Sequence, residues 1–444
     1  MEERIRSLLE ENNLKELKNV INELNSSDLA YCIVDYSMND LAKVFRLINK
    51  DKAVEVFADL DVTVAGELLR YLSDKEVVNI IDEMSRDDAV DVLEEMPANI
   101  VDKILKMCSS STRKDINKLL NYKEDSAGSI MTVEYAELKS EYTILESVDV
   151  LKSNYEEYET INTCFVVDKK RKLLGTVSLP DLLFNDKKKL IKDITKEEII
   201  YCTTSTDQEE VAEMFKKYDL SVMPVVDSEN RLVGIITIDD VVDVLEEEAS
   251  EDIAKISGML PTEKAYFKLS LFDIYKSRMP WLLFLMISAT LTGAIISSFE
   301  KSLASCAILT VFMPMVMGTG GNAGAQSSVT VIRALSLDEI EFKDAFKVLF
   351  KESLVGIICG LTLAICNFFK LILIDNVDMM ISFVVCLSLF LTVLFAKIIG
   401  AVLPILADKI HLDPAVMANP IITTIVDAGS LFLYFQVESI LLGL

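Results

Sequence analysis

Three polar residues recur at four-residue intervals inside a long apolar stretch near the C-terminus. Asn419, Thr423 and Asp427 in "NPIITTIVDAG" take positions i, i+4 and i+8, so a helix would place them on one face, which we call the polar stripe. An unpaired polar group in hydrocarbon costs several kcal/mol, so such residues are candidates for function. Because the polar stripe offers mainly oxygen atoms and one negative charge, it predicts a path for cations.

A second polar segment, "PMVMGTGGNAGAQSS", occupies residues 314–328. Its distinctive members are Pro314, Gly318, Gly320, Gly321, Asn322, Gly324 and Gln326. A proline followed by glycines predicts a broken membrane helix, which is tolerated where it lines a wet cavity. Close packing of helices through small residues is the alternative, and it explains the glycines but leaves Asn322 and Gln326 unexplained.

Two further residues bear on Asp427. Pro420 lacks an amide hydrogen, so it should release the carbonyl of Val416, one turn earlier, as a free acceptor. Lys397, which lies in another apolar stretch, is the evident basic partner for Asp427. A structural Asp427–Lys397 ion pair is therefore an alternative to the cation path, although it leaves the rest of the polar stripe unexplained.

Long apolar stretches dominate the C-terminal part of the chain. They cover residues 281–299, 303–317, 353–374, 380–406 and 414–442. Each is close to or above the ~20 residues that a helix needs to cross a hydrocarbon core, so we predict five transmembrane helices in a lipid bilayer. Basic residues before the first stretch and between the second and third predict a cytoplasmic N-terminus and an outside C-terminus. The charged start of the chain is unlike a signal peptide.

Nearly all of the net charge of −26 is carried by residues 1–270. A surface this acidic repels nucleic acid and attracts cations, so metal ions are the expected partners and nucleic acid is not. The eight cysteines show no Cys-x-x-Cys spacing, which argues against a zinc site or a disulfide framework. The single histidine, His411, has no second imidazole to share a metal and is read as an ordinary loop residue.

The pattern of residues 1–122 predicts a succession of short amphipathic helices. Segments such as "SDKEVVNII" and "SRDDAVDVL" begin with serine and aspartate, which cap helices by accepting hydrogen bonds from free amides. Because such units recur at a regular spacing, they predict a stacked, superhelical array.

An internal repeat follows. "FVVDKKRKLLGTVSLPDLL" at residues 165–183 realigns on "PVVDSENRLVGIITIDDVV" at residues 224–242. The constant offset pairs Asp168 with Asp227, Gly175 with Gly234, and Asp181 with Asp240. Each copy predicts two strands and a helix, preceded by an amphipathic helix, and the whole unit is βαββα.

The second copy continues into an acidic segment, "TIDDVVDVLEEEASEDI", at residues 237–253. Here Asp240, Asp243, Glu247 and Glu251 fall on one helix face, where like charges repel unless cations intervene. A few carboxylates from facing elements suffice for Mg²⁺, which keeps several of its waters. A solvated acidic face is an equally good interpretation of the spacing alone. Residues 254–278 should then form a mostly helical connector to the first membrane helix.

Taken together, these motifs resemble a known family. The repeat, with "GSIMT" at residues 128–132, resembles a tandem pair of CBS domains, and "GTGGNAGAQ" with "DPAVMANPIITTIVDAG" completes a similarity to the MgtE-type magnesium channel family. The implied fold class is a multidomain membrane protein with a superhelical α-helical N-domain, α/β CBS domains and a five-helix transmembrane α domain. The implied boundaries are residues 1–124 for the acidic helical domain, 125–188 and 189–252 for the CBS domains, 253–279 for a connector (plug) helix and 280–444 for the transmembrane domain.

The resemblance also implies a mechanism. Two chains would form a homodimer with one pore on its two-fold axis, where Asp427 of both subunits faces a hydrated Mg²⁺. Asn419, Thr423, Asn322 and backbone oxygens around Gly318 and Gly321 would line the ion pathway. Regulatory Mg²⁺ would bind at the positions matching the family's sensor, which are Asp87, Asp91, Asp219, Asp240, Asp243, Glu248 and Asp252.

The implied function is Mg²⁺ uptake through the cell membrane, closed when Mg²⁺ binds the cytoplasmic domains, with no enzymatic activity. ATP or another adenine nucleotide is an expected ligand of the CBS pair. Two alternatives stay open: a broader transporter of divalent cations such as Mn²⁺ or Co²⁺, and a membrane-tethered Mg²⁺ sensor that conducts nothing. An intramembrane aspartyl protease would need two carboxylates per site, whereas Asp427 is the one intramembrane acid that we identify.

Overall fold

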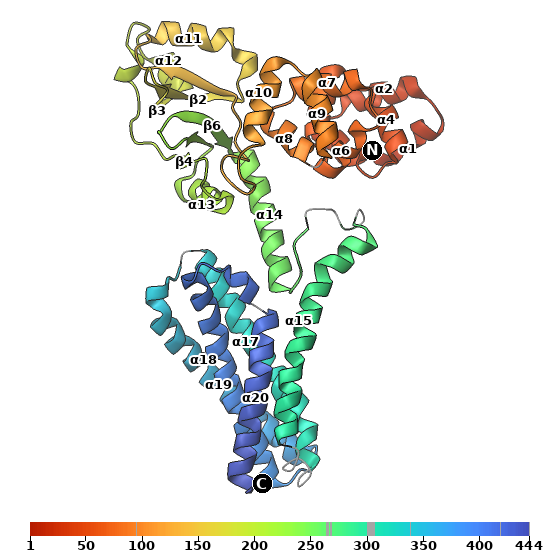
Figure 1. Ribbon diagram of the computed structural model, residues 1–444, viewed down its shortest axis with the longest axis vertical. Coiled ribbons are helices and arrows are strands. Elements are labelled where there is room, and N and C mark those ends of the chain that lie inside the picture. Colours follow the sequence, from red (N-terminus) through yellow and green to blue (C-terminus); the bar gives the residue numbers. More distant parts are fainter. Residues whose placement is uncertain are drawn as a thin grey trace. The chain divides into compact units, whose positions relative to one another are not determined.

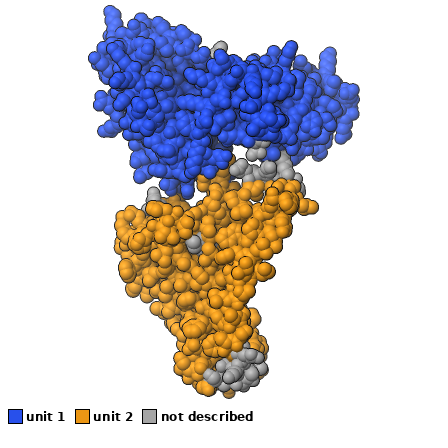
Figure 2. All heavy atoms as spheres, viewed as in Figure 1, with its two compact units in different colours: residues 1–246 blue, residues 247–444 orange. Residues whose placement is uncertain are grey.

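The computed structural model describes residues 1–94, 96–262, 266, 269–299, 307–337, 339–417 and 419–443. It divides into two compact units, residues 1–246 and residues 247–444, which Figure 2 shows in blue and orange. The division falls inside helix α14 (Ile238–Ile256), so this one helix leads from the first unit into the second.

The first unit begins with short helices that stack on one another (Figure 1). Their bounds are α1 Glu2–Glu10, α2 Leu14–Glu23, α3 Ser26–Ile33, α4 Met38–Phe45, α5 Lys50–Ala58, α6 Val62–Leu69, α7 Asp74–Glu83, α8 Arg86–Glu94, α9 Ala98–Met107 and α10 Ser110–Leu119. From α3 to α7 each helix packs against the one two places further along, as in helical repeat proteins. Ser73 and Glu76 form a capping box at the start of α7. The predicted stacked array of capped helices is confirmed.

Two modules with three-stranded sheets follow. The first contains β1 Tyr135–Lys139, α11 Ile144–Ser153, the 3-10 helix η1 Tyr155–Glu157, β2 Thr160–Val167, β3 Leu173–Ser178 and α12 Leu179–Phe184. After the 3-10 helix η2 Ile191–Asp193, the second contains β4 Cys202–Thr203, α13 Gln208–Tyr218, β5 Val222–Val226, β6 Leu232–Thr237 and α14. In each sheet the first two strands are parallel and the last two antiparallel. This order confirms the predicted βαββα repeat.

Each module lends its lead-in segment to the sheet of the other. Thr132 exchanges backbone hydrogen bonds of 2.8 and 2.9 Å with β6, and Lys196 exchanges two of 3.0 Å with β3. A Cβ on Gly234 would lie 2.8 Å from the carbonyl oxygen of Thr132, and one on Gly175 would lie 2.5 Å from that of Lys196. The repeated glycines are therefore needed where the exchanged segments cross the sheets.

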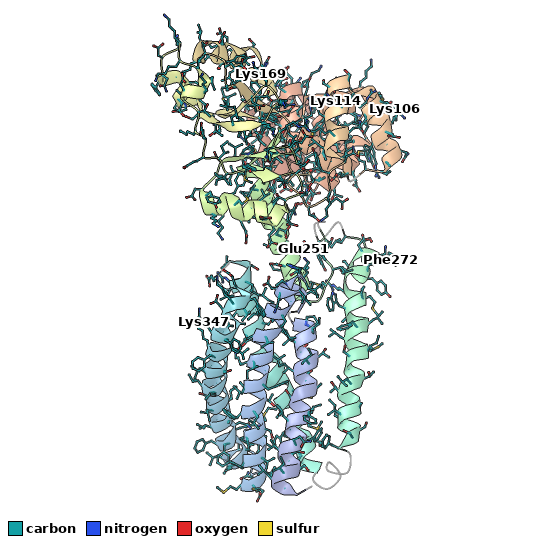
Figure 3. The ribbon with its side chains drawn as sticks, turned by 60° about the vertical axis from the view of Figure 1, so that its left-hand side comes forward. Lys106, Lys114, Lys169, Glu251, Phe272 and Lys347 are labelled. Atoms are coloured by element: carbon teal, nitrogen blue, oxygen red, sulfur yellow. The ribbon has the colours of Figure 1, made fainter. Side chains whose placement is uncertain are left out.

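The second unit is a bundle of long helices that lie side by side (Figures 1 and 3). Its elements are α15 Leu271–Ser298, η4 Ala307–Phe312, α17 Met313–Ser336, η5 Phe342–Asp344, α18 Ala345–Leu373, α19 Met379–Lys409, η6 Pro414–Met417 and α20 Asn419–Leu442. Helix α19 contacts α17, α18 and α20. Within the described residues, four helices are long and apolar enough to cross a membrane: Leu271–Ser298, Phe342–Leu373, Met379–Lys409 and Pro420–Leu442.

The predicted second span, residues 303–317, does not stand as a separate helix. Residues 300–306 lie outside the described residues, and residues 307–312 form η4. Helix α17 begins at Met313 with Pro314 in its first turn, where no amide hydrogen is required, and it continues through the glycines without a break. The predicted helix break after Pro314 is therefore wrong. Because the polar helix α17 is not among the four candidate spans, the prediction of five spans is not confirmed.

The connector between α14 and α15 also differs from the prediction. Gly258, just beyond the end of α14, has a φ of 68°, a left-handed conformation that follows many helix ends. Residues 257–262 are not helical, and α15 begins at Leu271. The predicted connector over residues 254–278 is therefore interrupted by a non-helical segment at 257–262, where the glycine turns the chain, and residues 263–265 and 267–268 lie outside the described residues.

Candidate ion pathway and acid cluster

The glycine-rich helix α17 packs directly against the polar stripe of α20. A Cβ on Gly321 would lie 3.6 Å from Cγ2 of Thr423 and 3.8 Å from Oδ1 of Asp427. The structure thus brings together three of the predicted pathway residues, from helices about a hundred positions apart in the chain. Asn419 begins α20, but its side chain lies outside the described residues.

The other glycines of α17 serve helix packing, as the alternative interpretation proposed. A Cβ on Gly320 would lie 2.6 Å from Cγ2 of Thr392, and one on Gly324 would lie 3.4 Å from the carbonyl oxygen of Ala396. These contacts let α19 approach α17 closely. Gly318 differs, because nothing in the described structure lies within 4 Å of its Cβ position.

The described residues leave one polar face of α17 exposed. Gly318, Asn322 and Gln326 are exposed and follow one another at four-residue spacing. Glycine backbone and amide side chains are poor surfaces for lipid. We infer that this face meets water or another polypeptide.

Lys397 of α19 does not form the proposed structural pair with Asp427 within the described residues. Its side chain is buried, with 6% exposure, and its Nζ donates to Oε1 of Gln326 over 3.5 Å. Nearby, Ser327 of α17 donates to the carboxylate of Glu352 on α18. The lysine therefore stays inside the bundle as a fixed positive charge beside α17.

The start of α20 corrects one more prediction. Pro420 lies in the first turn of α20, and Val416 belongs to the preceding 3-10 helix η6. Because Val416 belongs to a 3-10 helix and not to α20, Pro420 interrupts no α-helical hydrogen bond to the carbonyl of Val416. The carbonyl of Pro420 itself accepts hydrogen bonds from the hydroxyls of Thr423 and Thr424 over 3.1 and 2.9 Å.

In the first unit, carboxylates of two distant segments interact with one another. Asp87, Asp88 and Asp91 of α8 lie within electrostatic reach of Asp239 and Asp240 at the start of α14. We call these five residues the acid cluster. Glu134, Glu159 and Arg86 border it, and the Nε of Arg86 lies 3.5 Å from Oε1 of Glu134. One arginine does not balance so many carboxylates.

Burial and mutual repulsion oppose ionisation of the acid cluster. Burial raises the pKa of Asp87, and burial together with the Asp87 charge raises the pKa of Asp240 to about 7. Burial and the neighbouring carboxylates raise the pKa of Asp88 to about 6 and that of Asp91 to about 8. The side chain of Asp91 is nevertheless open to solvent, so screening reduces its contribution to stability.

The acid cluster suits a hydrated cation better than a directly ligated one. Its ligand atoms are all oxygens, and Oδ1 of the buried Asp87 has no hydrogen-bond partner among the described residues. Among the residues that the structure describes, no three carboxylate, thiolate or imidazole groups converge closely enough to hold one metal ion. Mg²⁺ keeps several waters when bound, so it fits such a loose set of oxygens through its hydration shell.

Asp240 also has a structural role that explains the internal repeat. Its Oδ2 accepts a 2.6 Å hydrogen bond from the hydroxyl of Thr237, and Oδ2 of Asp181 accepts one of the same length from Ser178. Both aspartates therefore cap the helix that follows the last strand of a module. The repeated aspartate was predictable from the sequence as part of a helix cap, although the sequence analysis assigned Asp240 only a metal-binding role.

The remaining predicted sensor residues lie outside the acid cluster. Asp243 lies one turn further along α14, where burial raises its pKa, and Asp219 is exposed at the C-terminal end of α13. Glu248 and Asp252 belong to the part of α14 in the second unit. Burial and the charge of Asp413 raise the pKa of Asp252.

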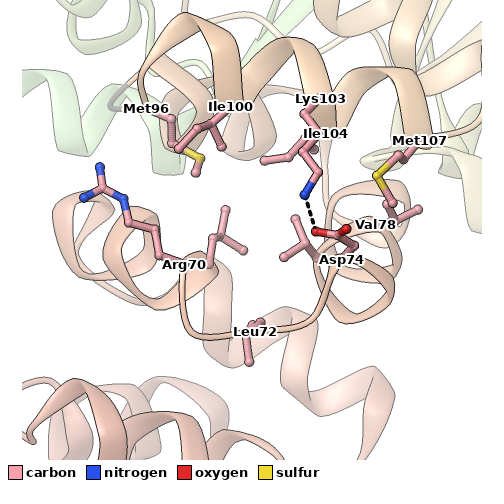
Figure 4. A pocket seen from close by; sticks show the side chains of 11 residues that line it. Arg70, Leu72, Asp74, Val78, Met96, Ile100, Lys103, Ile104 and Met107 are labelled. Atoms are coloured by element: carbon pink, nitrogen blue, oxygen red, sulfur yellow. Dashed lines mark hydrogen bonds and ion pairs between the residues drawn. The ribbon is translucent and has the colours of Figure 1, made fainter.

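A lysine already neutralises part of the predicted acidic face of α14. Nζ of Lys255 pairs with Glu251, which Figure 3 labels near the end of the helix, and lies 2.7 Å from Oδ2 of Asp413. The Lys255–Asp413 ion pair joins the end of α14 to the segment before α20. A separate cavity of 270 Å³ between helices of the N-terminal stack is lined mainly by apolar residues (Figure 4). The carboxylate in its lining, that of Asp74, is already paired with Lys103 over 2.7 Å.

The fold and these two polar regions describe a multi-pass membrane protein with two βαββα modules and a helical acidic domain. Profiles of three families match: the divalent cation transporter MgtE over residues 313–437, the MgtE intracellular N domain over 24–125 and the CBS domain over 191–247. The magnesium transporter MgtE of Bacillus subtilis (strain 168) is 32% identical over 440 residues, 98% of this chain and 96% of that protein.

The magnesium transporter MgtE of Thermus thermophilus is 38% identical over 331 residues, 74% of this chain and 73% of that protein. A crystal structure of the cytosolic domain of the Mg²⁺ channel MgtE in complex with ATP is 34% identical and has a TM-score of 0.53, covering 55% of this chain and all of that one. The chain belongs to the MgtE family, and the resemblance seen in its sequence is confirmed.

Proposed function

We propose that this protein carries Mg²⁺ into the cell through its membrane unit and that Mg²⁺ bound to its cytoplasmic unit closes the path. The observation that carries the proposal is Asp427, an acid inside the last apolar helix, held against Gly321 and Thr423. Oxygen ligands without cysteine or histidine suit Mg²⁺. An inward-negative potential supplies ~2.3 kcal/mol per charge per 100 mV, so passive entry of a divalent cation is sufficient.

The uncovered polar face of α17 supports a homodimer with a shared pathway. Gly318, Asn322 and Gln326 would be costly against lipid, whereas a second copy of the chain would cover this face and leave a polar passage between the subunits. The passage would have Asp427 of each subunit beside it. We extend the proposal to α17 as the fifth crossing helix, with the N-terminus in the cytoplasm and the C-terminus outside.

The acid cluster supports the closing mechanism. Without a cation, its carboxylates repel one another across two elements, and a bound hydrated Mg²⁺ would remove that repulsion. An ion drives closure only through tighter binding to the closed state, so several weak sites acting together fit this arrangement. Asp243, Asp219, Glu248 and Asp252 would supply further sites. We also propose that the CBS pair binds ATP or another adenine nucleotide, as the related cytosolic domain does.

The test is Mg²⁺ flux into liposomes that contain the purified full-length protein. Asp427→Ala should lower flux to the level of empty liposomes, a loss of about 100-fold or more, because the only formal charge of the polar stripe is gone. Thr424→Ala is the matched control, since its hydroxyl donates to the same carbonyl as Thr423 but lies off the polar stripe, and it should keep normal flux.

Other outcomes select the alternative functions. Flux of Mn²⁺ or Co²⁺ at the rate of Mg²⁺ would make the protein a broader divalent cation transporter. Absence of flux in the wild-type protein, combined with Mg²⁺-dependent protection of residues 1–246 from proteolysis, would make it a sensor that conducts nothing. Undiminished flux in Asp427→Ala would exclude Asp427 from the path.

A further inference from the structure

One lysine fixes the C-terminal end of α14 to the segment before α20. Nζ of Lys255 lies 2.7 Å from Oδ2 of Asp413 and also pairs with Glu251, one turn earlier on α14. The side chains of Lys255 and Asp413 are only 25% and 34% exposed. Water and salt therefore screen this ion pair less than they screen a pair on an open surface.

Asp413 passes the contact on to the turn that precedes α20. Its other carboxylate oxygen, Oδ1, accepts a 2.7 Å hydrogen bond from the backbone amide of Ala415 in η6. Ala415 is buried, and η6 packs against both α19 and α20. Because one carboxylate joins Lys255 to the backbone of η6, a displacement of the end of α14 acts on the start of α20.

A second contact joins the same elements. Gly258, just beyond the end of α14, is buried, and a Cβ on it would lie only 2.7 Å from Cγ of Pro420. The carbonyl of Pro420 in turn accepts the hydroxyl hydrogen of Thr423, a member of the polar stripe. We call Lys255, Asp413, Gly258 and Pro420 the clamp. The clamp connects α14 with the first turn of the helix that carries the polar stripe.

The clamp needs no metal ion to hold it. Burial alone would lower the pKa of Lys255, but the hydrogen bonds and charges of Asp413 and Glu251 raise it above its ordinary value. Asp252 lies near the same ion pair, and burial together with the charge of Asp413 raises the pKa of Asp252. The lysine ammonium thus supplies, from within the chain, a positive charge among these carboxylates.

The clamp and two members of the acid cluster occupy opposite ends of one helix. Asp239 and Asp240 lie in the first turn of α14, and Lys255 lies in its last turn. The fifteen residues from Asp240 to Lys255 span about 22 Å at ~1.5 Å per residue, without a break in the helix. A displacement of the start of α14 therefore reaches its end.

We propose that Lys255 is a positioning residue that couples the acid cluster to the polar stripe. It ties the end of α14 to η6, so that a movement of α14 is passed to the first turn of α20. The coupling to closure rests on the proposed function, whereas the tie between the two elements does not.

The first test measures the tie without any transport. Tyr266, between Gly258 and α15, is 66% exposed, so chymotrypsin can cleave after it. In the full-length protein in detergent with EDTA, Lys255→Gln should speed this cleavage about threefold, because the end of α14 is no longer held. Lys255→Arg keeps the charge and should keep the wild-type rate. A wild-type rate in Lys255→Gln overturns the proposal.

The matched control for both tests is an ion pair of the same length elsewhere in the bundle. Nζ of Lys370 lies 2.7 Å from Oδ2 of Asp375, five residues further along the chain, so this pair joins no distant elements. Lys370→Gln should therefore match the wild-type protein in cleavage and in closure. Faster cleavage in Lys370→Gln as well would assign the effect to general loosening and overturn the specific tie.

The second test measures the coupling as Mg²⁺ current across a planar bilayer that contains the full-length protein. The Mg²⁺ concentration is varied only on the side that exposes residues 1–246. Without Mg²⁺ on that side, Lys255→Gln should conduct within about twofold of the wild-type protein, whereas at a concentration that closes the wild-type protein it should retain about five times the wild-type current. Unchanged closure, or an equal loss of current under both conditions, overturns the coupling.

A double-mutant cycle checks that Lys255 acts through Asp413. Asp413→Asn keeps an oxygen for the amide of Ala415 but loses the charge that faces Lys255. If one ion pair carries the effect, Asp413→Asn and the double variant should show the same residual current as Lys255→Gln. Additive increases would mean two separate effects and would overturn the tie. If the wild-type protein carries no current, the proposed function fails, and the cleavage rates still decide the tie.

Discussion

The acid cluster of the first unit and the polar stripe of the second use carboxylates in opposite ways. The acid cluster crowds five aspartates from two elements, so each raises the cost of ionising the next. The polar stripe isolates one aspartate and surrounds it with glycine and threonine. Crowded carboxylates respond steeply to a bound cation, which suits a switch. An isolated carboxylate binds an ion without a large change in its neighbours, which suits a path.

The two regions are alike in how their nearby basic side chains are used. Lys397 lies beside Gln326 in the second unit, and Arg86 pairs with Glu134 at the border of the acid cluster. In the described residues neither base pairs with Asp427 or with Asp87. Both regions thus keep their key acids available to an outside cation, and the first two predictions below test whether crowding is what separates them.

The largest expected effect is the pH dependence of the crowded region. An aspartate whose pKa is raised in the folded state binds more protons folded than unfolded, so stability is lost as pH rises from about 4 towards the folded pKa. With Asp88 at about 6 and Asp240 at about 7, the fragment 1–246 without metal should lose about 2–4 kcal/mol of unfolding free energy between pH 5 and pH 8.

Chemical denaturation at the two pH values in EDTA measures this loss. Mg²⁺ should restore most of the stability at pH 8 and little at pH 5, because protons already neutralise the acid cluster there. Ca²⁺-free buffer with added Na⁺ at equal ionic strength is the control for simple screening. Equal stability at both pH values would show that crowding does not strain this region.

A matched pair of substitutions isolates crowding from capping. Asp181 and Asp240 are equivalent helix caps, but hydrogen bonds from Ser178 and a Lys196 Nζ 3.3 Å away lower the pKa of Asp181, whereas Asp240 faces Asp87. At pH 8 without metal, Asp181→Asn should destabilise the fragment by about 1 kcal/mol, and Asp240→Asn should be neutral or stabilise it by about 1 kcal/mol.

Denaturant titration of both variants checks the sign. The two effects should converge at pH 5, where Asp240 is already protonated and only its capping role is lost. If both substitutions destabilise equally at pH 8, the repeat carries capping alone and the acid cluster adds no repulsion.

Periodic features of the sequence predicted most of the architecture, because they depend on neighbours along the chain. The stacked helices, the βαββα repeat and the apolar helices follow from spacing alone. Contacts between distant segments were harder to predict. Asp88 was overlooked beside Asp87 and Asp91, since its place in the acid cluster depends on α14, about 150 residues away. Pro314 is equally compatible with a helix start and a helix break, and only the packing of α17 on α20 decides.

Lys397 gives the smallest expected effect and tests whether the polar stripe is electrostatically isolated. Its buried ammonium lies beside Gln326, on the helix that also carries Gly321. A positive charge near a divalent cation path opposes entry of the cation, and a repulsion weakened by water in the passage is worth roughly 1 kcal/mol. Lys397→Met keeps the length and burial of the side chain while removing the charge, so flux should rise about fivefold at low salt and less at high salt.

Lys397→Arg separates charge from packing in the same liposome assay. It retains the positive charge, so flux should stay close to that of the wild-type protein even if the larger head group moves Gln326. A rise in both variants would mean that Lys397 acts through the packing of α17 on α19 and not through its field. No change in either variant would mean that the lysine charge does not reach the ion at Asp427, and the isolation of the polar stripe would then be complete.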